Sequence, residues 1–166
     1  MPTRVLKMNK SLKYEDIINT EGKLVWKIQG VSMLPLIKQD RDIVVIRKIS
    51  DELKKYDVVL FKRHNLKTEK DDYVLHRILK VNGDGTYYIV GDNCISGDVV
   101  KKENIIGILD GIVRNGKDIR LNGCGYRLYL FFVGDLYKVR IFNKRQVMKL
   151  KSVIKHILEC LKASYQ

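Results

Sequence analysis

The sequence predicts a mainly-β fold, a sandwich or a coiled, barrel-like sheet, with a short N-terminal helix and a basic helical C-terminal tail. Three observations carry this prediction. Short β-branched or alternating apolar runs recur between residues 23 and 113. The motifs Asn82-Gly83-Asp84-Gly85 and Asn115-Gly116 stand where strands must reverse. After Gly125, apolar residues instead recur at steps of three and four, with Lys and Arg between them.

The elements follow in order along the chain. A short helix is expected from Ser11 to Thr20, with Ser11 as N-cap and Gly22 just after its end. Polar loops are expected from Arg63 to Asp72, as a hairpin, and from Gly91 to Asp98. Strands are predicted over residues 23–29, 42–47, 57–62, 73–81, 86–90 and 105–113.

Length and composition bound the class of protein. The 166 residues are 45% hydrophobic and 31% charged, which predicts one globular domain and excludes a disordered chain. No apolar window approaches the length of a spanning helix, and residues 1–13 lack the apolar core of a secretory signal. Three widely spaced cysteines without a CxxC pair argue against a disulfide framework and a zinc site. We therefore expect a cytoplasmic protein with no metal and no cofactor.

The positive charge is concentrated at the C-terminal end. The net charge is +13, and Arg120 to Gln166 holds ten basic residues against Asp135 and Glu159. Such a tail is compatible with nucleic acid, anionic lipid or an acidic peptide. Nucleic acid is not expected, because no aromatic stacking motif or recognition helix accompanies the charge. The amphipathic tail can pack on the β-domain, and the alternatives are that it lies on a membrane surface or binds a partner.

A serine stands in an unusual setting at Gly30-Val31-Ser32-Met33-Leu34-Pro35. Glycine permits backbone conformations closed to other residues, and proline fixes its own φ and restricts the residue before it. This turn can present the Ser32 hydroxyl at the edge of a sheet. It can also be an ordinary junction between a strand and a turn, with a hydrogen-bonded serine.

His76 interrupts the apolar run Val74 to Leu79, with Arg77 beside it. Burying both in a strand is unfavourable unless each has a partner. Ser32 and an acid would supply partners for His76, since a neutral imidazole can take a serine proton and a carboxylate can orient the ring. Asp92 and Asp98 are the nearby acids, although either can equally be a turn residue.

Taken together, five segments resemble the sequence boxes of signal peptidases in their order and spacing. GVSMLP is similar to the box of the nucleophile, YDVVLF to the next strand, YVLHRIL to the box of the general base, GDNCISGD to the GDN box, and IIGILDGI to the closing strand. The resemblance covers residues 23–120 and implies the coiled β-sheet of signal peptidases and LexA-type serine peptidases. It implies a catalytic domain over residues 23–121, after a helical lead-in at 1–22 and before a tail at 122–166.

The resemblance also implies roles for individual residues. Bacterial signal peptidases have Lys-Arg where this chain has His76-Arg77, so the chain resembles the Ser/His variety of endoplasmic-reticulum and archaeal enzymes. Ser32 is then the nucleophile, His76 the general base and Asp98 the orienting acid, six residues after Asp92. Asp92 supports the site and Arg77 braces the loop acids. Further residues of the serine turn and the loop complete the predicted site: Gly30, Val31, Met33 and Asn93.

The implied function is hydrolysis of a peptide bond in a precursor or leader-bearing peptide by a serine endopeptidase. Signal peptidases have a membrane anchor and LexA-type repressors have a helix-turn-helix module, and neither is visible before Ser32. We therefore expect a cytoplasmic enzyme, with peripheral contact at the inner membrane surface as one role of the tail. The alternatives are a non-catalytic peptide-binding module of the same fold, a nucleic-acid-binding regulator and a LexA-like protein that cleaves itself.

Overall fold

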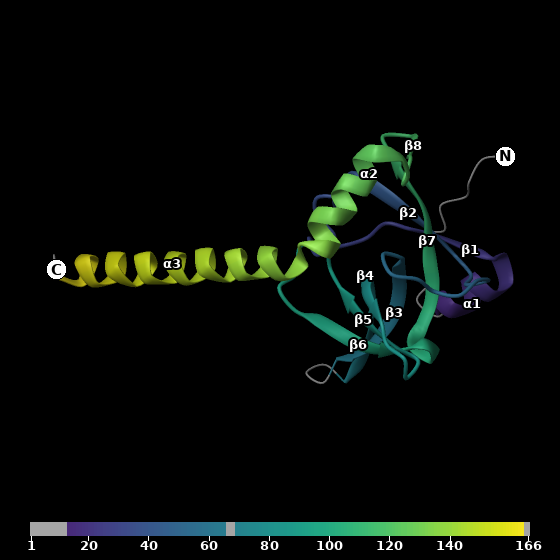
Figure 1. Cartoon of the computed structure of the whole chain (residues 1–166), viewed down its shortest axis with the longest axis horizontal. Helices are drawn as coiled ribbons and strands as arrows, with labels where there is room; N and C mark the ends of the chain where they lie inside the picture. Colours follow the sequence, from purple (N-terminus) through teal and green to yellow (C-terminus); the bar gives the residue numbers. More distant parts are fainter. Residues whose placement is uncertain (1–12, 66–68, 165–166) are drawn as a thin grey trace. The chain divides into compact units, whose positions relative to one another are not determined.

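One antiparallel sheet of eight strands organises the first part of the chain (Figure 1). The computed structural model describes residues 13–65 and 69–164. The sheet order is β1-β2-β7-β3-β4-β5-β6, and β8 pairs with the second half of β7. The strands are β1 Lys23–Trp26, β2 Asp42–Arg47, β3 Val58–Asn65, β4 Lys70–Val81, β5 Thr86–Val90, β6 Gly97–Lys101, β7 Ile105–Arg114 and β8 Lys117–Ile119.

The mainly-β prediction is confirmed, but the sheet is open. β1 and β6 lie at its two ends and do not pair with each other, so no closed barrel forms in the described residues. Register shifts in β2, β3 and β4 interrupt three of the strand pairs, and such bulges bend and twist a sheet. The predicted mainly-β class is therefore confirmed, and the sheet is not a closed barrel.

Two apolar clusters form the core, one on each face of the central strands. In β3, Val58 and Leu60 belong to the first cluster, whereas Val59 and Phe61 belong to the second. The alternation follows from the two-residue period of a strand, which sends successive side chains to opposite faces. β4 continues it, with Leu75 in the first cluster and Ile78 in the second.

Helix α1, Tyr14–Glu21, lies beside β1 and buries Ile18 in the first cluster (Figure 1). Gly107 on β7 allows this close approach, because a methyl group there would stand 2.5 Å from Ile46 Cγ2 and 3.2 Å from Ile18 Cδ1. The helix ends at Gly22, whose φ of +72° is the left-handed conformation that favours glycine. Lys13 occupies the N-cap, and the predicted cap Ser11 lies outside the described residues.

The prediction of a loop from Arg63 to Asp72 is wrong at both ends, where the chain forms strands. β3 continues to Asn65 and β4 begins at Lys70. Polar contacts across the two strands explain the extension: Lys62 forms an ion pair with Asp71, His64 Nδ1 lies 3.1 Å from Asp71 Oδ1, and Asn65 Nδ2 donates a hydrogen bond of 2.9 Å to Asp72. Such cross-strand pairs stabilise a hairpin whose residues are polar.

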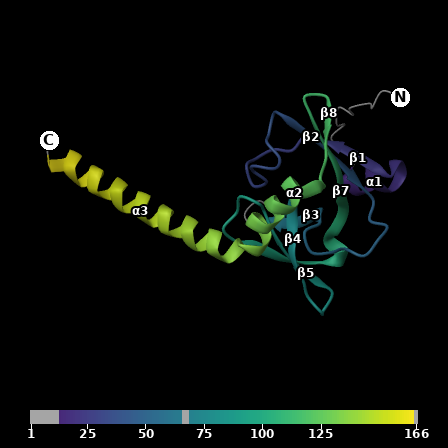
Figure 2. The same cartoon turned by 45° about the horizontal axis from the view of Figure 1, so that its top comes forward.

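Other boundaries also differ from the sequence prediction. β6 begins inside the predicted loop 91–98, and the sequence prediction has no strand at either β6 or β8. The strand predicted over 23–29 ends early, at Trp26, where the chain leaves the sheet toward the serine turn. The Asn115-Gly116 reversal is confirmed, since both residues have positive φ, as a tight hairpin turn requires. Figure 2 shows β8 at this turn, beside β7.

The chain divides into two compact units, the first ending at Gly123 and the second beginning at Cys124. The second contains most of helix α2, Gly123–Leu130, a π-helical turn at Phe131–Asp135, and the long helix α3, Tyr137–Ser164. A helical C-terminal tail is thus confirmed. In the described residues, every helix is too short or too polar to span a membrane.

Candidate active site

The serine turn is fixed by buried residues on either side of its exposed tip. Met33 and Ile37 are fully buried in the first apolar cluster, and the Ile37 N–H donates to Met33 O at 2.9 Å. Gly30 has a φ of +92°, and its N–H donates to Gln39 Oε1 at 2.7 Å. Val31 is 61% exposed and Ser32 is half-buried. The turn therefore presents Ser32 between an exposed residue and a buried anchor.

A buried carboxylate holds the exit of this turn. Asp42 accepts hydrogen bonds from the Lys38 N–H at 2.8 Å, from Arg41 and from Arg114. Arg114 also donates to Leu36 O at 2.9 Å, so β7 contacts the turn directly. Burial raises the pKa of Asp42, but the hydrogen bonds outweigh burial and keep this pKa well below its ordinary value.

His76 lies on β4 opposite Val59, on the face of the second apolar cluster. Only 6% of the residue is exposed, and its ring centroid stands 6.0 Å from that of Phe61. Burial lowers the pKa of His76 from 6.5 to about 4; Asp98 and, less strongly, Asp92 oppose the shift, while Arg63 adds to it. The imidazole is therefore neutral at pH 7, the form that can accept a proton.

Gly91 is the point at which the serine turn and His76 meet. A methyl group on Gly91 would stand 2.8 Å from Ser32 O, 2.9 Å from His76 Nε2 and 2.6 Å from Cys94 Sγ. Asn93 links the two segments further, since its N–H donates to Ser32 O at 2.7 Å and its Nδ2 donates to Val31 O at 3.1 Å. The 91–94 loop therefore contacts both the serine turn and the strand of His76, and it links the two.

Arg77 and Asp92 form an ion pair that joins β4 to this loop. Both Asp92 oxygens accept hydrogen bonds from Arg77, at 2.8 and 2.7 Å, and both side chains are almost wholly buried. Arg77 also donates to Tyr56 O at 2.9 Å. A bidentate pair of this kind fixes both partners in orientation. Both carboxylate oxygens of Asp92 are thus bound by Arg77.

Asp98 lies at the start of β6, opposite Ile89, and its Oδ2 stands 3.4 Å from Arg63 Nη1. Within the described residues, His76 Nδ1 is buried and has no hydrogen-bond partner. Asp98, the acid expected to orient His76, instead contacts the exposed guanidinium of Arg63 on β3. Asp98 still acts on His76 through its charge, more strongly than Asp92 does.

Several residues at the site were outside the sequence prediction. Gly91 and Cys94 lie within the GDNCISGD segment. The first glycine of this segment was the signal that could have been used, because a glycine allows two neighbouring segments to approach closely. Arg63, Gln39 and the Asp42–Arg114 pair carry no local signal, because their partners are distant in the sequence or of unremarkable type.

The donors available to a negatively charged oxygen are backbone N–H groups of the turn. The Gly30 N–H is already bound to Gln39, whereas no hydrogen bond within the described residues uses the N–H groups of Val31 and Ser32. Among those residues no cluster of three His, Cys, Asp or Glu side chains could hold a metal ion, and the three cysteines form no disulfide with one another. The groups that could take part in a reaction are the Ser32 hydroxyl, the neutral His76 imidazole and backbone N–H donors. No family model and no curated protein matches this chain.

Proposed function

We propose that this protein is a serine endopeptidase of the signal-peptidase-like, Ser/His type. The observation that carries the proposal is the convergence at Gly91 of the Ser32 turn and His76 Nε2, an atom of an imidazole that burial keeps neutral at pH 7. Acyl transfer by serine needs a neutral base near the serine hydroxyl, and His76 Nε2 lies near the backbone of the serine turn. The resemblance of five segments to the signal-peptidase boxes adds support to this assignment.

The proposed reaction proceeds in two steps. Ser32 Oγ attacks the peptide carbonyl while His76 accepts the serine proton, which it then gives to the leaving amine. Water repeats the attack on the acyl-enzyme and releases the acid, again with His76 as base. The N–H groups of Val31 and Ser32 are the proposed oxyanion donors. Asp98 stabilises the transient imidazolium through its charge.

No hydrogen bond joins Ser32 Oγ to His76 within the described residues, and such bonds often tighten only when substrate is bound. The proposed substrate is a precursor or leader-bearing peptide on the cytoplasmic side of the membrane. Three cysteines that form no disulfide with one another agree with a reducing compartment.

The second candidate is a peptide-binding module of the same fold without turnover. One observation favours it: His76 Nδ1 has no acid partner in the described residues, and Asp98 contacts Arg63. Without a partner that orients it, a histidine is a weaker base for a serine. The two candidates differ in whether Ser32 is reactive.

Active-site labelling tests this difference in the full chain. A fluorophosphonate, and in parallel a penem, should label the wild type and fail to label Ser32→Ala. We expect His76→Ala to be labelled at least about 100-fold more slowly, because the base is lost. Mass spectrometry should place the adduct on residue 32.

The control is Cys94→Ser, since the Cys94 thiol lies as close to the Gly91 position as His76 does. This variant should keep wild-type labelling. Labelling that is lost in Cys94→Ser but kept in Ser32→Ala would move the nucleophile to Cys94. A wild type that reacts with neither probe, while the fold is intact by circular dichroism, would favour the binding module.

A further inference from the structure

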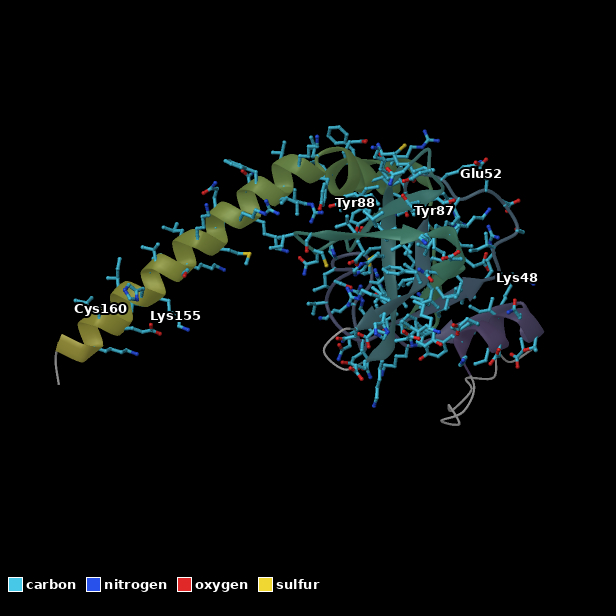
Figure 3. All side chains as sticks on the ribbon, turned by 90° about the horizontal axis from the view of Figure 1, so that it is seen from below. Lys48, Glu52, Tyr87, Tyr88, Lys155 and Cys160 are labelled. Atoms are coloured by element: carbon cyan, nitrogen blue, oxygen red, sulfur yellow. The ribbon has the colours of Figure 1, made fainter. Side chains whose placement is uncertain are left out.

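Helix α3 gathers most of its exposed apolar residues on one side, most clearly from Val147 onward. With about 3.6 residues per turn, one side of the helix carries nine apolar side chains, each between 48% and 62% exposed. These are Val139, Phe142, Val147, Leu150, Val153, Ile154, Ile157, Leu158 and Leu161. Figure 3 shows the side chains along α3, with Lys155 and Cys160 labelled.

The remaining arc of α3 is strongly cationic. The helix contains eight Lys and Arg residues and a single acid, Glu159. Lys149 and Lys151 fall at the two margins of the apolar side, whereas Lys155 falls within the basic side, which also holds the half-exposed Met148. Lysines at such margins can extend their ammonium groups away from an apolar surface that their stems help to cover.

We propose that α3 lies in the interface of an anionic lipid membrane, with its apolar side among the acyl chains and its lysines at the phosphates. A wide apolar side and a cation-rich polar side are the features of interfacial helices. Each Lys or Arg near an anionic surface adds to the attraction. The charge of the helix thus complements phospholipid headgroups, and its apolar side supplies the buried area.

A second copy of the chain fits α3 less well. Val147, Leu150, Ile154, Ile157 and Leu161 follow the alternating three- and four-residue steps of a coiled-coil seam. The flanking positions, however, offer no acidic residue to pair with Lys151, and Val153 and Leu158 extend the apolar side beyond a narrow seam. Two such helices, each with eight cations, repel each other.

Vesicle co-sedimentation of the full chain tests the proposal. We expect binding to phosphatidylcholine vesicles only when they contain phosphatidylglycerol, and weaker binding at high salt, because salt screens the attraction. Reversing three exposed lysines, Lys149→Glu, Lys151→Glu and Lys162→Glu, should weaken binding at least about 100-fold. The pair Leu150→Ser and Ile157→Ser should weaken it about 100-fold as well.

Matched controls lie in the first unit. Lys48→Glu, Lys54→Glu and Lys80→Glu change the net charge of the chain by the same amount, and Val81→Ser with Val99→Ser removes exposed apolar surface from strands. Both control sets should bind as the wild type does. Equal weakening by controls and α3 variants would overturn the proposal, since binding would then follow net charge or general hydrophobicity.

A fluorophore reports which side of α3 enters the lipid. Cys160 lies at the edge of the apolar side, so in a chain with Cys94→Ser and Cys124→Ser an environment-sensitive dye on Cys160 should shift its emission to the blue on anionic vesicles. The same dye on Lys155→Cys, with Cys160→Ser added, should shift little. Equal shifts at both positions would contradict the proposed orientation.

Two other results would also overturn the proposal. If the apolar variants lower the urea midpoint and the wild type does not bind vesicles, α3 packs on the first unit. If the wild type forms dimers that the apolar variants abolish, again without vesicle binding, the occupant is a second copy. Lipid binding by Ser32→Ala should equal that of the wild type, so a failure of the peptidase proposal remains distinguishable.

Discussion

At Gly91, the lack of a side chain is what allows three groups to share one small volume. Ser32 O, His76 Nε2 and Cys94 Sγ all lie within 3 Å of the position that a methyl group would occupy. Ser32 O belongs to the backbone and accepts the Asn93 N–H, so it cannot rotate away as a side chain can. Any residue larger than glycine must therefore push the serine turn and the histidine apart.

We predict that Gly91→Ala loses most of its reactivity while it keeps its fold. A displacement of about 1 Å between nucleophile and base can cost about 100-fold in rate, so labelling by the fluorophosphonate should slow by roughly that factor. Gly111→Ala is the control, since a methyl group there meets no atom within 4 Å. Wild-type labelling of Gly91→Ala would mean that Ser32 and His76 do not depend on this close approach.

Residue type and spacing could predict Ser32, His76 and the two acids as candidates, but not which atoms meet. His76 is conspicuous in the sequence because a polar ring in an apolar strand needs a partner. The choice between Asp92 and Asp98 depends on which cation each one contacts, and Arg63 approaches Asp98 from 35 residues away. Such contacts follow from strand pairing and leave no local pattern.

At the scale of elements, strand pairing by polar residues explains the largest error in the predicted boundaries. Apolar periodicity locates β2 and β5 to the residue, since each has a β-branched or aromatic run between turns. It fails where β3 and β4 extend as a hairpin of Lys, His, Asn and Asp, because an ion pair and hydrogen bonds across the strands replace apolar contacts there. β8 is missed because three residues are too short to show a period.

The link between β2, β7 and the serine turn depends on Asp42, whose side chain is fully buried. We predict that Asp42→Asn lowers the free energy of unfolding by about 3 kcal/mol, because it removes a charge that Arg41 and Arg114 both contact. Urea denaturation would measure this loss. Labelling of Ser32 should fall as well, since Lys38 N and Leu36 O are held through the same pair.

Asp40→Asn is the matched control for this prediction. The Asp40 side chain is 73% exposed and its ion pair with Lys27 is a surface contact, which typically contributes under about 1 kcal/mol. Its φ of +64° also suits asparagine. If the two variants unfold at the same urea concentration, the buried carboxylate does not hold the turn.

At the scale of the whole molecule, the candidate base connects the site with the stability of the first unit. The pKa of His76 is about 4 in the folded chain and lies near 6.5 when the residue is solvated. Between these values the unfolded chain binds more protons than the folded one, so stability rises with pH across this window. The contribution of His76 is fully present above about pH 6.5 and is lost as the pH falls toward 4.

We predict that unfolding free energy falls by up to about 3 kcal/mol between about pH 6.5 and 4, and that His76→Gln removes this dependence above about pH 5, where the carboxylates remain charged. His64→Gln should keep it, because His64 is exposed on the same hairpin. Urea denaturation across the pH range measures both variants.

The same burial places the acid limb of the pH profile of the labelling rate near pH 4, since His76 becomes protonated near that value. A limb near pH 6.5 would mean that the imidazole is solvated, which would contradict the burial of His76 behind its lowered pKa.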